Sequence, residues 1–132
     1  MNSKRLLKLA DHLDTVPRKV FNMGTWYDVD TDAAPSCQTQ ACAMGHATNV
    51  PAFRRLGLRK EQTYEDCNTK SYDVTMPGCR NGGGMDAAVE LFGIKRDDAE
   101  VLFSPAYDKA PETPKQVAKR IRRFVANAEA NQ

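Results

Sequence analysis

The sequence predicts a mainly α-helical protein: a single small domain over residues 1–132, with about five or six helices and at most a minor β-element. Apolar residues recur at the helical spacing of three and four in several separate segments. Prolines and glycines, which start and stop helices, fall at the ends of those segments. A chain of 132 residues is long enough for one hydrophobic core. No apolar run approaches the ~18 residues that a membrane span needs, so we expect no membrane contact.

The first expected helix covers residues 4–15, with Ser3 as its N-cap and Pro17 closing it. Its apolar residues share one face: Leu6, Leu9, Ala10 and Leu13. Residues 20–27 are then expected to form a short strand or a packed extended segment.

A second helix is expected over about residues 38–48, and Pro51 starts a short third helix, 51–56, that Gly57 ends. Residues 59–84 contain proline and four of the eight glycines, so we expect an irregular connection there. Within it, apolar and polar residues alternate over residues 72–76. This alternation is typical of one short strand, which would pair with the segment around Phe21.

Three helices are expected in the last third of the chain. Residues 85–92 are helix formers followed by Gly93, and a further helix over 97–103 is halted by Pro105. The last helix opens at a capping box beginning with Thr113. It places Val117, Ile121, Phe124 and Ala128 on one face.

The net charge of +2 excludes a strongly acidic DNA mimic and does not by itself indicate nucleic-acid binding. The charge is nevertheless arranged in blocks, with acids over residues 84–112 and two basic segments. Such a dipolar surface suits protein partners or self-association as well as nucleic acid. The candidate partner-binding residues are Arg54, Arg55, Arg59, Lys60, Lys119, Arg120, Arg122 and Arg123.

The cysteines carry four alternative interpretations. Cys37, Cys42 and His46, with Cys67 or Cys79, invite a structural zinc site, although the spacing between the cysteines is unlike a zinc knuckle. Small residues around Cys42 equally suit close helix packing. In the third interpretation Cys37 is a nucleophile with His46 or His12 as its base. The fourth is a redox pair, Cys37–Cys42 or Cys67–Cys79, although neither has the Cys-x2-Cys spacing of thioredoxin-like sites. No complete catalytic constellation is present, so we assign no catalytic residue and no cofactor, with zinc as the alternative.

The pattern Cys37-x-Thr39-x-x-Cys42-x-x-Gly45-x-Ala47 resembles a motif of an uncharacterised family of small proteins from bacteriophages and bacterial mobile elements. Gln38 stands where that family usually has glycine, and His46 where it often has Trp. The resemblance implies a phage-type accessory protein that binds a host or phage macromolecule stoichiometrically, most simply a protein, and inhibits a host defence or other host machinery.

The N-terminal residues lack an uninterrupted apolar leader, so the expected location is the cytoplasm, that of the host cell for a phage-encoded protein. Two other functions remain open from the sequence. One is a zinc-organised module or cysteine-dependent enzyme centred on Cys37, Cys42 and His46. The other is weak nucleic-acid binding through the basic C-terminal helix.

Overall fold

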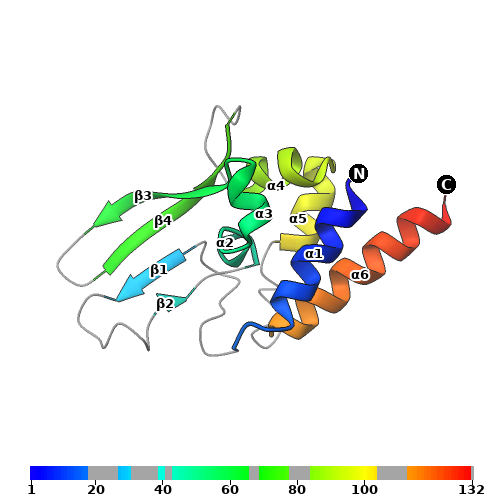
Figure 1. Cartoon of the computed structure of the whole chain (residues 1–132), viewed down its shortest axis with the longest axis horizontal. Coiled ribbons are helices and arrows are strands. Elements are labelled where there is room, and N and C mark those ends of the chain that lie inside the picture. The colour runs from blue at the N-terminus through cyan, green and yellow to red at the C-terminus, as the bar shows by residue number, and fades with distance from the viewer. Residues whose placement is uncertain are drawn as a thin grey trace.

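The computed structural model describes residues 1–17, 27–30, 39–40, 43–65, 69–77, 84–103 and 113–131. The described residues form helices α1 (Ser3–Leu13), α2 (Ala43–Ala47), α3 (Pro51–Arg55), α4 (Gly84–Phe92), α5 (Arg96–Phe103) and α6 (Pro114–Ala130). They also form strands β1 (Tyr27–Asp30), β2 (Thr39–Gln40), β3 (Arg59–Glu65) and β4 (Thr69–Thr75). Figure 1 shows the helices gathered on one side and the sheet extending from the other. The prediction of a mainly helical protein is confirmed.

The four strands form one antiparallel sheet in the order β2-β1-β4-β3. β3 and β4 pair from Arg59↔Thr75 to Glu65↔Lys70, with an irregularity between Gln62 and Tyr64. The expectation of an irregular connection over residues 59–84 was therefore wrong for residues 59–65 and 69–71. β3 is almost entirely polar, so its sequence lacks the alternation of apolar and polar residues that predicts a strand. The strand forms because it pairs with β4.

The strand predicted over residues 72–76 is present as part of β4 and begins earlier, at Thr69. It pairs with β1, which begins at Tyr27. The expected extended segment over residues 20–27 lies outside the described residues except for Tyr27.

Side-chain caps begin the two longest helices. At α1 the Asn2 Oδ1 accepts a hydrogen bond of 3.1 Å from the Arg5 backbone N–H, so the N-cap is Asn2 and not the predicted Ser3. At α6 the predicted capping box is confirmed. The Thr113 Oγ1 accepts from the Gln116 N–H at 3.2 Å, and the Gln116 Oε1 accepts from the Thr113 N–H at 2.8 Å.

The predicted second helix is much shorter in the structure, because α2 covers only Ala43–Ala47. Thr39 and Gln40, expected at its start, pair instead with β1 as strand β2. The ends of α3 and α4 are as predicted: Gly57 and Gly93 follow them with φ of +100° and +62°, values that favour glycine.

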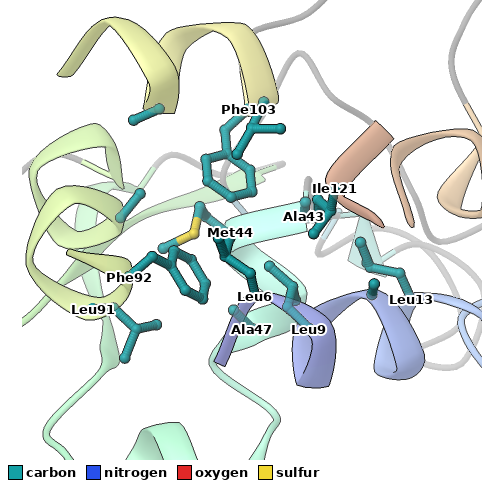
Figure 2. Close-up of a cluster of buried hydrophobic side chains, with 14 of the residues drawn as sticks. Leu6, Leu9, Leu13, Ala43, Met44, Ala47, Leu91, Phe92, Phe103 and Ile121 are labelled. Atoms are coloured by element: carbon teal, nitrogen blue, oxygen red, sulfur yellow. The ribbon is translucent and has the colours of Figure 1, made fainter. Parts of the chain in front are cut away.

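The hydrophobic core lies among the helices, and Figure 2 shows buried side chains from several of them gathered in one cluster. Leu6 of α1 lies beside Met44 of α2 and Phe92 of α4, with Leu9 next to it, whereas Leu13 lies at the opposite side of the cluster. The rings of Phe92 and Phe103 stack with centroids 5.7 Å apart, and Phe53 meets Phe92 edge-on at 5.9 Å. All five residues of α2 are buried, so this short helix is held by its neighbours rather than by its own propensity.

Candidate functional site

Four exposed cations gather where α3 ends and β3 begins, and we call Arg54, Arg55, Arg59 and Lys60 the α3–β3 basic surface. Leu56 lies between them with 40% of its surface exposed. A single exposed leucine is common on protein surfaces, but arginine is enriched at protein interfaces, so an apolar side chain among arginines suits a protein contact.

Local backbone geometry produces this arrangement. Phe53 and Leu58 are buried on either side of the turn and anchor it to the core. The Leu58 N–H donates to the Phe53 carbonyl at 3.1 Å, and Gly57 between them turns the chain sharply. A Cβ at Gly57 would lie 2.5 Å from Pro77 Cδ, so the segment that follows β4 packs directly against this turn.

The arginines of this surface take part in none of the ion pairs formed by the described side chains. No described carboxylate pairs with Arg54, Arg55 or Arg59. Their charges are therefore available to an outside anionic group. Lys60 does make an interaction within the chain.

The predicted basic residues of α6 divide into different environments. Lys119 and Arg123 are exposed, whereas Arg120 is half-buried and makes an interaction of its own within the chain. The Arg122 Nη2 donates to Asp11 Oδ1 at 2.9 Å and to Asp14 Oδ2 at 2.6 Å. These hydrogen bonds raise the pKa of Arg122, and they join α6 to α1, which run alongside each other in Figure 1.

The two basic segments do not form one surface. Figure 1 places α3 beside the sheet and α6 on the other side of α1. The predicted partner-binding residues thus form an α3–β3 set and an α6 set, and Arg122 of the second set is already engaged within the molecule.

The sequence reasoning also missed the acids that engage Arg122. Asp11 and Asp14 lie 111 and 108 residues away from it along the chain, so no local pattern connects them. Another contact of this kind joins Arg5 of α1 to α4, where its Nη1 donates to the Leu91 carbonyl at 2.8 Å. Arg5 lines an open depression of about 570 Å³ between the start of α1 and the end of α4.

The cysteine cluster lies outside the described part of the chain, because Cys37, Cys42, Cys67 and Cys79 are all among the residues left undescribed. The zinc, packing, nucleophile and redox-pair interpretations therefore stay predictions. His46 is described and is 8% exposed within α2. No group of three or more His, Cys, Asp or Glu side chains suited to a metal occurs in the described ranges.

His12, the other candidate base, lies on α1 and is half-buried. Burial lowers the pKa of His12, because a partly desolvated imidazole disfavours the charged form. A neutral imidazole at physiological pH is a chemically competent base, but the cysteine proposed as its partner lies outside the described residues.

No family model matches the chain, and comparison with curated proteins and with solved structures finds no match either. None of the described helices combines the length and the apolar composition needed to cross a membrane.

Proposed function

We propose that this protein acts by stoichiometric binding to a protein partner that presents an acidic surface, and that the α3–β3 basic surface makes the contact. The observation that carries the proposal is the set of exposed arginines without ion pairs in the described structure, grouped around the exposed Leu56. Arginine is enriched among the residues that contribute most of the binding energy at protein interfaces, and Leu56 adds apolar area beside the arginines, so this combination favours a protein.

A nucleic-acid partner is supported less well. Nucleic-acid affinity comes mainly from neutralised phosphates, and the chain carries a net charge of only +2. On α6, the segment first considered for phosphate contacts, Arg122 is paired with two aspartates. Leu56 also has no role in contacting phosphates.

The resemblance of the motif Cys37-x-Thr39-x-x-Cys42-x-x-Gly45-x-Ala47 to small phage proteins supplies the biological setting of the proposal. In that setting the protein is a phage-type accessory factor in the host cytoplasm. Its partner is a component of a host defence or other host machinery, and binding inhibits that component.

The test uses capture of a partner from bacterial lysate, followed by reconstitution with the purified partner. In the Arg54→Glu/Arg55→Glu variant both charges reverse at exposed positions, so folding should be unaffected and binding should weaken at least about tenfold. The matched control is Lys4→Glu/Lys8→Glu, which reverses two exposed charges on α1. It should bind the same partner normally.

Calorimetry should then give one partner molecule for each chain. The proposal fails if the two double variants bind the purified partner equally well. It also fails if nuclease treatment abolishes the capture, because nucleic acid would then be the bridging molecule.

A further inference from the structure

The exposed cations of α6 form a row. Lys115, Lys119 and Arg123 follow one another at a spacing of four residues, which places them on one face of the helix, about 6 Å apart. All three are exposed, and none of them pairs with a carboxylate in the part of the chain that the structure describes. We call them the α6 basic row.

Helix α5 has an outer face of the opposite charge. Asp97, Glu100 and Val101 are exposed and lie at spacings of three and four residues, so they are neighbours on that face. Glu100 lies 3.5 Å from the Arg96 Nε in an exposed pair, which leaves its charge largely available. Val101 is 63% exposed, the most of any large apolar side chain among the described residues.

We infer that a second copy of this chain docks here, with the outer face of α5 in one copy lying against the α6 basic row of the other. The acids on α5 and the cations on α6 each recur at about one helical turn. Each acid of one copy therefore meets a cation of the other along the contact. Val101 then packs against the aliphatic stems of Lys119 and Arg123, which are otherwise open to water.

The proposed contact is reciprocal. α5 and α6 contact each other within one chain, so the acidic face and the basic row lie on adjacent elements of the molecule. In a two-fold dimer each acidic face lies against the other copy's basic row, and the interface contains two identical contacts. This self-association does not involve the α3–β3 basic surface and does not depend on the function proposed for it.

Sedimentation of the full chain at low ionic strength tests the inference directly. We expect the mass to exceed that of a monomer with rising concentration, and the dissociation constant to increase about tenfold or more when salt rises from about 0.05 M to about 0.5 M. A monomer under all these conditions would overturn the inference.

Charge reversal provides the sharper test. Lys119→Glu/Arg123→Glu and Asp97→Lys/Glu100→Lys should each be monomeric alone, and mixing the two variants should restore association because both contacts again join opposite charges. Val101→Lys, at a position too exposed to affect folding, should also weaken association. If any of these three variants, studied alone, associates as strongly as the native protein, the proposed contact is contradicted.

A control separates this contact from general attraction between oppositely charged proteins. Lys4→Glu/Lys8→Glu carries the same total charge as the α6 reversal, but the change lies on α1. Mixed with Asp97→Lys/Glu100→Lys, it keeps one contact between opposite charges, but the other contact brings two basic surfaces together, so its heterodimer should be much weaker than that of the complementary mixture. Equal association in the two mixtures would refute the specific pairing of α5 with α6.

Discussion

Replacing Gly57 by alanine should lower the stability of the fold by about 3 kcal/mol, and two physical effects contribute. A side chain at a φ of +100° is strained by about 1–2 kcal/mol. The new Cβ would also lie 2.5 Å from Pro77 Cδ and 2.6 Å from its Cγ, so the turn or Pro77 must move, which typically costs about 1–3 kcal/mol.

The assay is urea and thermal unfolding of Gly57→Ala beside Gly93→Ala. Gly93 has a φ of +62°, and a Cβ there would have its nearest neighbours at an ordinary 3.8 Å. This control therefore contains only the backbone strain and should lose about 1 kcal/mol. The difference between the variants corresponds to a melting temperature about 6 °C lower for Gly57→Ala.

The contact with Pro77 can be isolated by a double-mutant cycle. In a Pro77→Ala background the clash is removed, so Gly57→Ala should lose at least about 1 kcal/mol less than in the native sequence. The reasoning is refuted if Gly57→Ala is no worse than Gly93→Ala, or if the Pro77→Ala background leaves its effect unchanged.

The remaining predictions concern caps, titration, ion pairs and metal. Thr113→Ala should destabilise the fold by about 1 kcal/mol and Thr113→Ser much less, as measured by urea unfolding, because only alanine abolishes the capping box. His12 has a lowered pKa in the folded state, so stability should fall as the pH drops through the ordinary value of 6.5, and His12→Gln should flatten that dependence; a flat profile in the native protein would contradict it. Arg122→Gln should lose about 0.5–1 kcal/mol at low salt, and less at high salt because its pairs with α1 are exposed. Elemental analysis with thiol titration decides the zinc alternative: one zinc per chain and unfolding by a chelator would establish it.

The helices could be predicted wherever the sequence carries a residue pattern that starts or ends a helix. The capping box at Thr113 and the glycines after α3 and α4 gave the ends of those helices closely. Local sequence patterns did not predict the strands that form only by pairing with distant segments. β3 is polar along its length, and Thr39 and Gln40 become strand β2 only because β1 lies beside them.

The candidate site shows the same division. The basic residues themselves were evident from the sequence, but their environments were not. Arg54 and Arg122 look equivalent along the chain, yet one is exposed without an ion pair in the described structure and the other is held by Asp11 and Asp14. Only the packing of α1 against α6 distinguishes them.

That packing also determines when the protein can finish folding. The burial of Leu6, Leu9 and Leu13 depends in part on α6, whose residues begin more than a hundred positions later. Contacts of such long range close slowly, because the intervening chain must first be brought together. During synthesis, α2 and α4 can cover only part of the apolar face of α1, and the rest stays exposed until residues 114–130 have left the ribosome.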